Sequence, residues 1–386
     1  MALIRVTIDA VPLLVRSAGV KNYLYYWTRH LQQEARGVDI RLFPFLDHVH
    51  RLNHEGSVAN PITTRMRLGM LFLLNRFPND ISGWMDPHAD VFHTCKLLNP
   101  PRRAKLTATV HDLTCWLLPE THAPANVAAD KLFAERILKR ADALIAVSEA
   151  TRGDAIRILN LPPEKIRVIH HGVADPFFQV KPGDAAAVRS RHGLERPYLL
   201  FVGTIEPRKN VDRLLNAYRD LPPSTRDEFD LVLAGPPGWA HTETMARLRH
   251  PAPGVRYLGY VAEPDLPGLF AGATAFVYPS LYEGFGFPVA QAMAAGTPVI
   301  TSSVSALPEI AGGAARLIDP LSEAALRDAI QEMLTSPSRR DRWIELGRAN
   351  ARRFSWLDCA RQSLQFFEEV AGQGMGFPPG AGGRLS

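Results

Sequence analysis

The sequence predicts an α/β protein in which two doubly wound parallel sheets follow one another along the chain. Three observations predict this class: short apolar runs alternate with helical patterns over most of the 386 residues, the alternation breaks once near the middle, and it then starts again. A chain of this length is too long for one ordinary core and fits two domains. Alternating strands and helices indicate parallel strands with helices on both faces of each sheet.

The first half of the chain supplies the strands of the first sheet. Residues 4–9 (IRVTID) read as a strand, and an apolar helical face follows at Val20, Leu24, Trp27 and Leu31. Further strands are expected at 39–45, 90–94, 106–112, 143–148 and 166–172, with helical patterns at 125–140 and 149–159.

Residues 172–187 (GVADPFFQVKPGDAAA) interrupt this rhythm with proline, glycine and mixed polarity, so we expect the domain linker there. The second sheet then follows, with strands expected at 197–204, 230–235, 255–261, 275–280, 297–301 and 315–319. A helix with one apolar face is expected at 358–372.

Composition narrows the class of protein. Hydrophobic residues make up 46% and charged residues 22%, as in folded globular proteins, and the net charge of +5 is too mild for a nucleic-acid-binding stripe. Cys95, Cys115 and Cys359 are too widely spaced for a disulfide framework or a metal cluster, which indicates a reducing cytoplasm. Arg5 and Asp9 interrupt the first apolar stretch, and no run reaches the ~18 to 20 residues of a membrane span. We therefore expect a cytoplasmic protein.

Two cations lie where the first strand of the second half ends. This strand ends at Gly203 and Thr204, and the next loop carries Arg208 and Lys209 before a helix near Val211. Cations at the carboxyl end of a strand, beside a helix N-terminus, suit a diphosphate. A solvated basic turn is the alternative, but the position at the start of a doubly wound half favours binding.

Residues 280–296 (SLYEGFGFPVAQAMAAG) place a carboxylate and a glycine-lined turn in front of a helix. Gly284 and Gly286 let the backbone approach a ligand with its amides free to donate, and Glu283 precedes them. Pro288 suits the first turn of the helix. A tight strand-to-helix turn without a ligand is the alternative.

The first half offers weaker candidates. His111 and Asp112 follow the strand at 106–112, so both are expected at the ligand-binding edge of the sheet. There His111 can donate a hydrogen bond to a developing charge or a sugar hydroxyl. Gly19 lies between the first strand and the first helix, where a bare backbone can approach a ligand. A structural histidine and a simple turn are the alternatives.

Several cofactor motifs are missing from the sequence. It contains neither the G-x-G-x-x-G dinucleotide fingerprint at 203–210 nor a Walker A sequence, and no Asp-x-Asp is set to hold a metal against a diphosphate. We therefore expect no metal and no cofactor, and we expect Arg208 and Lys209 to neutralise the diphosphate instead.

Taken together, these blocks resemble the retaining nucleotide-sugar glycosyltransferases with the GT-B fold, the glycosyltransferase group 1 family. The resemblance covers nearly the whole chain, and its blocks follow in order: HDL (111–113), ALIAVSEATR (143–152), FVGTIEPRKN (201–210), YPSLYEGFGFPVAQAMAAGTPVI (278–300) and SALPEIAGGAARLIDP (305–320). The last blocks are most similar to bacterial mannosyl- and rhamnosyltransferases that build surface polysaccharides.

The resemblance implies two Rossmann-like domains facing each other across a cleft. It places an acceptor-binding domain at 1–178 and a nucleotide-sugar-binding domain at 179–354. A C-terminal helix at 355–374 would cross back to the first domain, and a flexible tail is expected at 375–386.

The resemblance also assigns roles residue by residue. Arg208 and Lys209 would hold the diphosphate, Glu283 would contact the donor sugar, and His111 would support the transition state. The donor would be bound further by Gly203, Thr204, Gly284, Phe285, Gly286 and Gln291, and the acceptor side would include Gly19 and Asp112.

The chain departs from the family pattern at three points. Gln291 stands where the family usually has a second acid that binds the ribose, Lys21 replaces a glycine near the N-terminus, and His170 and His171 replace a Pro-Asn pair. A carboxamide oxygen still accepts a ribose hydroxyl, but without the charge that makes such bonds roughly twice as strong. We expect weaker or differently selected nucleotide binding at Gln291.

The expected reaction is transfer of a hexose, with retention, from a nucleotide-diphosphate sugar to a hydroxyl of a glycan or lipid-linked acceptor. GDP-mannose is the expected donor, from the similarity of the C-terminal blocks. A phosphorylase or sugar synthase, and a non-catalytic nucleotide-sugar-binding subunit, stay open as alternatives.

Residues 60–78 (NPITTRMRLGMLFLLNRFP) read as an amphipathic helix. Its apolar face comprises Ile62, Met66, Met70, Leu73 and Phe77, with Arg65, Arg67 and Arg76 nearby. Such a helix can rest on an anionic membrane that carries a lipid-linked acceptor, which would make the protein peripheral at the inner face of that membrane. Packing of the helix on the first sheet is the alternative.

Overall fold

The computed structural model describes residues 3–15, 19–44, 46, 52, 56–76, 80–238 and 242–372. The chain forms two compact units. The N-terminal unit comprises Met1–Leu113, Ala128–His171 and Trp356–Ser386, and the C-terminal unit comprises Thr114–Val127 and Gly172–Ser355. The tail expected at 375–386 lies outside the described residues.

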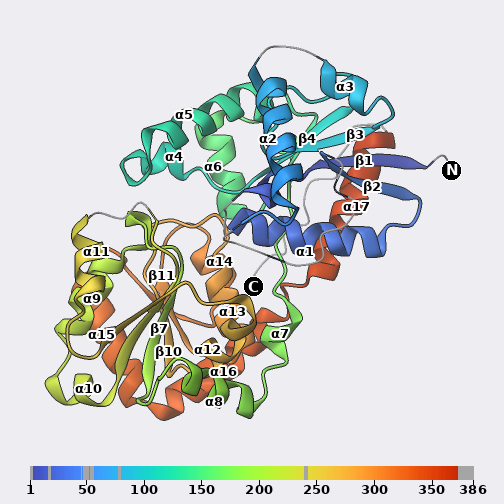
Figure 1. Cartoon of the computed structure of the whole chain (residues 1–386). Helices are drawn as coiled ribbons and strands as arrows, with labels where there is room; N and C mark the ends of the chain where they lie inside the picture. The colour runs from blue at the N-terminus through green and yellow to red at the C-terminus, as the bar shows by residue number, and fades with distance from the viewer. Residues whose placement is uncertain are drawn as a thin grey trace. The chain divides into compact units, whose positions relative to one another are not determined.

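The N-terminal unit is built on a six-stranded parallel sheet in the order β2-β1-β3-β4-β5-β6 (Figure 1). Its strands are apolar and mostly buried, as short core strands of a parallel sheet should be. They are β1 (Ile4–Asp9), β2 (Val38–Phe43), β3 (Val91–Thr94), β4 (Lys105–Val110), β5 (Ala143–Ala146) and β6 (Ile166–Val168).

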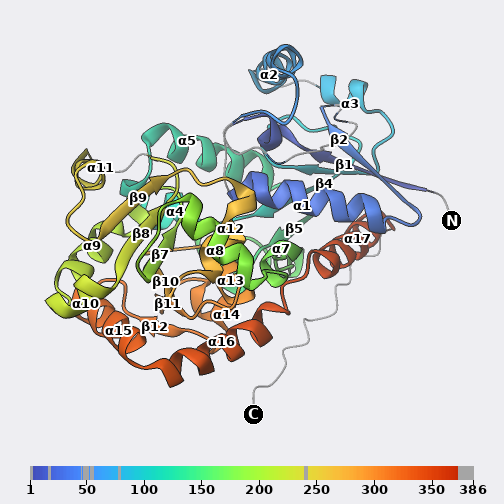
Figure 2. The same cartoon turned by 60° about the horizontal axis from the view of Figure 1, so that its bottom comes forward.

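The C-terminal helix of the chain belongs to the N-terminal unit. Helix α17 (Trp356–Gly372) packs on α1 (Gly19–Glu34), and the Trp27 indole donates a 2.9 Å hydrogen bond to Ser363 Oγ (Figure 2). The other helices between β1 and β6 are η1 (Val11–Leu14), α2 (Pro61–Arg76), α3 (Ile81–Met85), α4 (Thr114–Leu117), η2 (Pro119–Thr121), α5 (Pro124–Phe133), η3 (Ala134–Leu138), α6 (Glu149–Leu159) and η4 (Pro163–Lys165). The helix expected at 125–140 changes to a π-helix at η3.

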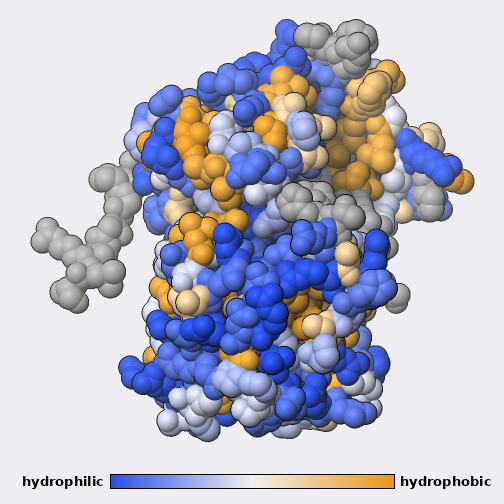
Figure 3. All heavy atoms as spheres, turned by 90° about the vertical axis from the view of Figure 1, so that its left-hand side faces the viewer, coloured by the Kyte–Doolittle hydropathy of each residue, from blue (hydrophilic) through white to orange (hydrophobic). Residues whose placement is uncertain are grey.

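Helix α2 packs on the core of the N-terminal unit mainly through residues outside the predicted apolar face, although Met70 of that face packs partly against the same core. Leu71 and Leu74 are buried in a cluster with Val11, Phe43 and Phe92. Ile62, Met66 and Leu73, from the apolar face predicted in the sequence, are exposed instead. Figure 3 shows that apolar side chains lie among hydrophilic ones on one face of the molecule. Phe77 lies outside the described residues, as does the side chain of Arg76.

The C-terminal unit has a second six-stranded parallel sheet, in the order β12-β11-β10-β7-β8-β9. Its strands are β7 (Tyr198–Val202), β8 (Asp230–Ala234), β9 (Val255–Gly259), β10 (Ala275–Tyr278), β11 (Val299–Ser302) and β12 (Arg316–Ile318). Counted within the unit, this is the Rossmann order 3-2-1-4-5-6. The prediction of two Rossmann-like doubly wound sheets is therefore confirmed.

The stretch expected to be an irregular linker contains two helices, α7 (Asp175–Phe178) and α8 (Pro182–Arg191), and belongs to the C-terminal unit. Its prolines lie in the first turns of these helices, where a missing N–H costs nothing. The segment Thr114–Val127 of this unit carries α4, η2 and the start of α5. The remaining helices of this unit are η5 (Pro207–Lys209), α9 (Val211–Arg219), α10 (Pro223–Glu228), α11 (Thr242–Arg249), η6 (Glu263–Asp265), α12 (Leu266–Ala271), α13 (Phe287–Ala294), α14 (Leu307–Ala311), α15 (Glu323–Thr335) and α16 (Pro337–Ala351).

Candidate functional site

The two loops singled out in the second half lie side by side at the switch point of the C-terminal sheet. Strands β7 and β10 are neighbours, and the chain leaves them towards opposite edges of the sheet. Ligands of open α/β sheets bind at such a point, outside the carboxyl ends of the strands. The loop after β10 is tied to the loop after β7, because Leu281 N donates a 2.8 Å hydrogen bond to Arg208 O.

Four charged side chains meet between these loops. Arg208 forms ion pairs with Glu206, at 2.6 Å, and with Glu283, at 2.9 Å. Lys209 contacts the same two carboxylates, at 3.9 Å for Glu206 and 2.6 Å for Glu283. The structure thus brings Arg208, Lys209 and Glu283 together as predicted, and it adds Glu206 as a second carboxylate that balances their charge.

The carboxylate of Glu283 is held from several sides. Its Oε1 atom accepts three hydrogen bonds, from Lys209 Nζ at 2.6 Å, the Tyr278 hydroxyl at 2.9 Å and Ser280 Oγ at 2.7 Å. Its backbone N–H donates to Ser305 Oγ at 3.0 Å. Sequence reasoning missed Tyr278, Ser280 and Ser305, although the first two lie directly before the glycine turn in the same block.

The charged groups of the cluster shift one another's pKa values. Burial alone would raise the pKa of the Glu283 carboxyl, but the neighbouring Arg208 and Lys209 lower it to about 2. Burial and the nearby Arg208 lower the pKa of the Lys209 ammonium, against the opposing effect of both glutamates. Burial raises the pKa of Tyr278 well above its usual value, so its hydroxyl stays protonated and donates to Glu283.

The glycine turn before α13 requires glycine at one position in particular. Gly286 has φ +99°, and a Cβ there would lie 2.8 Å from Leu307 Cδ2. Phe285 turns its ring into the core, where it meets Phe287 and Phe354 edge-on. Gly284 and Glu283 are buried beside it. The turn therefore presents backbone rather than a side chain at Gly286.

Gly235 is a further required glycine, which the sequence pattern did not reveal. It has φ +144°, and a Cβ there would lie 1.9 Å from the carbonyl oxygen of Gly203. Gly203 N in turn donates to Ala234 O at 2.9 Å. The ends of β7 and β8 can approach this closely only without a side chain at Gly235. Thr204 lies beside another glycine, Gly238, whose Cβ would be 2.7 Å from Thr204 Cγ2.

Gln291 is buried on α13, one helix after the glycine turn. Its side-chain amide makes no hydrogen bond with any residue that the structure describes. A buried amide normally has a partner. The side chain is thus available to a ligand group.

A cavity of about 340 Å³ adjoins the loop after β7. Its lining includes the carboxylates of Glu206, Asp212 and Glu323. The lining also includes Arg213, and two of the carboxylates are ion-paired, Glu206 with Arg208 and Asp212 with Arg247.

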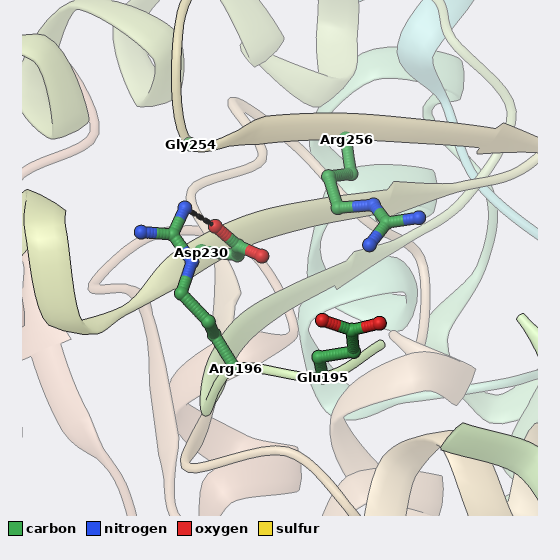
Figure 4. Close-up of a pocket in the computed structure, with 5 residues that line it drawn as sticks. All are labelled: Glu195, Arg196, Asp230, Gly254 and Arg256. Carbon is green, nitrogen blue, oxygen red and sulfur yellow. Dashed lines mark hydrogen bonds and ion pairs between the residues drawn. The ribbon is translucent and has the colours of Figure 1, made fainter. Parts of the chain in front are cut away.

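A second cavity, of about 330 Å³, lies at the amino ends of β7, β8 and β9 (Figure 4). Arg196 pairs there with Asp230, and Arg256 donates to Gly193 O at 2.5 Å. Ligands of open α/β sheets bind at the carboxyl ends of the strands, and this cavity lies at their amino ends. These contacts therefore serve to hold the strand ends together.

In the N-terminal unit, His111 follows β4 as predicted. Its ring meets that of Tyr23 edge-on, with centroids 5.1 Å apart. Its Nε2 atom is buried and finds no hydrogen-bond partner among the residues that the structure describes. Burial lowers the pKa of His111 to about 4, although the adjacent Asp112 opposes this shift. The imidazole is therefore neutral near pH 7.

Gly19 is the first residue of α1 and is exposed, and a Cβ there would meet nothing within 4 Å. The structure thus shows no steric need for glycine at this position. The nearby Lys21, which replaces the family glycine, is fully buried, and its Nζ donates to Gly56 O at 2.7 Å.

Asp9 occupies the switch point of the N-terminal sheet, between β1 and β3. Its Oδ2 atom accepts from the backbone N–H groups that follow β3, those of Cys95, Lys96 and Leu97, at 2.6 to 3.0 Å. Sequence reasoning gave Asp9 no such role, since the loop that it binds is 86 residues or more away in sequence. It fixes the loop next to β4, the strand that His111 follows.

The described residues contain neither a metal-binding cluster nor a membrane-spanning helix. Within them, no group of three or more His, Cys, Asp or Glu side chains is placed to hold a metal ion. No helix in the same ranges is long and apolar enough to cross a bilayer. Cys95, Cys115 and Cys359 form no disulfide among the described residues.

Comparisons with known proteins agree with this architecture. The family model described as Glycosyl transferases group 1 matches residues 185–350, and the one described as Glycosyltransferase Family 4 matches residues 17–175. The O-antigen chain mannosyltransferase B of Escherichia coli is 35% identical over 282 residues, which cover 72% of this chain and 74% of that protein. The chain belongs to the group 1 glycosyltransferases.

Solved structures match this glycosyltransferase over almost its whole length. Sucrose-phosphate synthase from Thermosynechococcus elongatus has a TM-score of 0.73 at 22% identity and covers 95% of this chain and 98% of its own. Anabaena Alr3699/HepE in complex with UDP and glucose has a TM-score of 0.70 at 18% identity, covering 95% and 99%. At these identities the likeness shows the fold, which is GT-B.

Proposed function

We propose that this glycosyltransferase moves a hexose, with retention at the anomeric carbon, from a nucleotide-diphosphate sugar to a hydroxyl of a glycan or lipid-linked acceptor. The observation that carries the proposal is the cluster of Arg208, Lys209 and Glu283 at the switch point of the C-terminal sheet. Mannose is the proposed sugar and GDP-mannose the proposed donor, because the relative from Escherichia coli is a mannosyltransferase.

Arg208 and Lys209 would stabilise the departing diphosphate. Both are fixed in place by Glu206 and Glu283 before any ligand arrives. Preorganised cations stabilise developing negative charge without reorganising during the reaction. The backbone of Gly284, Phe285 and Gly286 would add amide donors beside them, and Gly203 and Thr204 would line the neighbouring loop. In this mechanism the charge is neutralised by side chains, without a metal.

Glu283 would orient the donor sugar rather than attack it. A pKa of about 2 makes its carboxylate a weak base, and three donors already occupy Oε1. We therefore assign it neither the general-base nor the nucleophile role. The acceptor hydroxyl would attack the anomeric carbon from the same face of the sugar ring as the leaving nucleoside diphosphate. Its proton would pass to the departing phosphate.

Gln291 and His111 would make neutral polar contacts. The Gln291 carboxamide oxygen would accept a ribose hydroxyl, since its side chain has no hydrogen bond within the described part of the chain. His111 would line the sugar site as an uncharged imidazole, because its pKa lies near 4. Asp112 and the exposed backbone at Gly19 are proposed on the acceptor side. A lipid-linked acceptor would place the enzyme at the inner face of a membrane.

Replacement of the two cations tests the proposal. In Arg208→Ala and Lys209→Ala we expect turnover of GDP-mannose to fall at least ~100-fold, as when one preorganised donor is lost, together with weaker GDP binding. Arg219→Ala is the matched control, since Arg219 is an exposed residue at the far end of α9. Unchanged turnover in both variants would remove the diphosphate clamp. Phosphate-dependent glycan breakdown would indicate a phosphorylase instead, and tight donor binding without transfer or hydrolysis a non-catalytic subunit.

A further inference from the structure

Asn210 ends the turn that carries the two cations of the candidate site. Helix η5 contains Arg208 and Lys209, and Asn210 follows directly with φ +61°, a left-handed conformation that suits glycine or asparagine. Asn210 also precedes α9, where its side chain would ordinarily cap the helix, but it makes no such bond to a described residue. Neither the backbone conformation nor the cap therefore explains why this position carries an asparagine side chain.

The Asn210 side chain instead bridges the ends of two other strands. Its Nδ2 atom donates to Pro279 O at 3.0 Å, just after β10, and to Pro320 O at 2.7 Å, just after β12. Its Oδ1 atom accepts from Arg213 at 2.9 Å. This orientation of the amide follows from its partners, since carbonyl oxygens only accept and a guanidinium only donates. Asn210, Pro279 and Pro320 are buried, so loss of the side chain would deprive both carbonyl oxygens of a donor away from water.

The end of β10 that is held in this way leads directly to Glu283. Pro279 is followed by Ser280, whose Oγ donates to Glu283 Oε1 at 2.7 Å. The next residue, Leu281, donates its backbone N–H to Arg208 O at 2.8 Å. The side-chain amide and this backbone bond therefore fasten the loop after β10 to the turn after β7 at two points.

We infer that Asn210 is a positioning residue, which sets the spacing between the cations Arg208 and Lys209 and the carboxylate of Glu283. The ion pairs of Glu283 with Arg208 and Lys209 are 2.9 and 2.6 Å long, and such contacts weaken steeply when distance or angle changes. A diphosphate held by the cations and a sugar oriented by the carboxylate need alignment on the same scale. What the cluster binds rests on the proposed function, whereas the way it is held rests on these contacts alone.

The substitution Asn210→Gly removes the side chain and keeps the backbone conformation, because glycine adopts a positive φ freely. We expect kcat with GDP-mannose to fall about 10-fold, since each lost hydrogen bond contributes roughly 2- to 12-fold. The preference for GDP over GMP should fall about 3-fold or more, because two cations distinguish a diphosphate from a single phosphate only when both are in place. A role in stability alone would change neither quantity.

The substitution Asn210→Asp keeps the size of the side chain and leaves no cavity. It removes both donors and places a carboxylate against the carbonyl oxygens of Pro279 and Pro320. We therefore expect a larger fall in kcat than in the glycine variant, of at least about 50-fold.

Asn160 offers a matched control. It has φ +53° at the end of α6, but it is exposed and its side chain makes no hydrogen bond with any residue that the structure describes. The variant Asn160→Gly should leave kcat and the preference for GDP unchanged.

Hydrogen exchange without any ligand measures the fastening itself. The backbone amide of Leu281 donates to Arg208 O, so it should exchange at least about 5-fold faster in both Asn210 variants. In Asn160→Gly its exchange should match that of the unaltered chain.

Either of two results would overturn the positioning role. One is unchanged exchange of Leu281 in both Asn210 variants, which would show that the amide does not hold the loop. The other is faster exchange with unchanged kcat and unchanged preference for GDP, which would leave Asn210 a role in stability alone. If the unaltered chain neither binds GDP nor transfers sugar, the proposed function fails, and the exchange of Leu281 still decides whether Asn210 fastens the loop.

Discussion

Tyr278 is the residue that links the two charged partners of the candidate site. Its hydroxyl accepts a 2.6 Å hydrogen bond from Lys209 Nζ and donates to Glu283 Oε1, while its ring stacks with Phe201 and Phe276. The hydroxyl and the ring therefore have separate roles. The substitution Tyr278→Phe removes the first and keeps the second.

For Tyr278→Phe we expect kcat to fall at least about 10-fold, because the variant loses two charge-assisted hydrogen bonds, each of roughly 1.5 to 3 kcal/mol, and this loosens Glu283 and Lys209. Steady-state kinetics with GDP-mannose measure this change. Tyr198→Phe is a matched control, since the Tyr198 hydroxyl donates to Leu269 O within the core. The control should lower the melting temperature to a similar extent and leave kcat unchanged. Equal kcat in both variants would contradict the positioning role.

Histidine burial sets the pH dependence of folding. His93 lies between Thr107 and Thr109, with a ring nitrogen 3.0 Å from each hydroxyl, and burial lowers its pKa from 6.5 to about 3. Since the unfolded chain takes up the proton first, stability is complete above pH 6.5 and is lost as the pH falls towards 3. Glu283 adds a loss in the same direction only below its ordinary pKa of 4.5.

At pH 5 we expect protonation of His93 in the unfolded chain to lower the free energy of unfolding by about 2 kcal/mol. This follows because pH 5 is about 1.5 units below the pKa of His93 in the unfolded chain. Urea unfolding at pH 7 and pH 5 measures the loss. His111 contributes in the same sense, because burial lowers its pKa to about 4. Burial also lowers the pKa of His171 well below its usual value, so three histidines share the effect. The variant His93→Gln should therefore lose about a third of the pH dependence in this range. An unchanged slope would show that the His93 imidazole is protonated in the folded chain.

Among the elements, the glycine turn into α13 depends on one backbone conformation. Gly286 precedes the helix with φ +99°, where a Cβ also meets Leu307. In Gly286→Ala we expect a loss of stability of about 1 to 3 kcal/mol and a higher KM for the donor, because the turn must shift. Gly153→Ala is the control, since Gly153 lies inside α6 with nothing within 4 Å of its Cβ. It should be stabilising by up to about 1 kcal/mol, and thermal unfolding compares the two.

The sequence predicted elements well where one physical rule acts alone. Apolar runs predicted the buried strands, and the convergence of strand ends placed Arg208, Lys209 and Glu283 in one cluster. Prediction from the sequence failed where two physical rules compete. Helix α2 is apolar on two faces, so its pattern could not say that Leu71 and Leu74 would be buried. The pairing of Arg208 with Glu206 depends on loop conformation, and the contact of Asp9 with the loop after β3 depends on the sheet order, so neither was visible in the spacing.

At the scale of the whole molecule, the chain leaves the N-terminal unit after His171 and returns to it at Trp356. The last helix, α17, then completes the first unit: Trp356, Leu364, Phe366 and Phe367 are buried, and Ser363 bonds the Trp27 indole. Four buried side chains of this size stabilise by roughly 6 to 12 kcal/mol, which is comparable to the stability of a whole domain. The N-terminal unit therefore depends on residues at the end of the chain.

A chain that ends at Ser355 should lose the folded N-terminal unit and keep the C-terminal one, because Gly172–Ser355 contains all six strands of the second sheet. We expect calorimetry to show one remaining transition, and GDP at 100 times its Kd to stabilise it by about 2.7 kcal/mol, as for any ligand that binds only the folded state. Sugar transfer should be lost, since His111, proposed for the sugar site, and Asp112, proposed on the acceptor side, lie in the other unit. Removal of 375–386, the tail predicted to be flexible, is the control and should change none of these properties. Loss of the GDP effect in the chain ending at Ser355 would show that nucleotide binding needs both units.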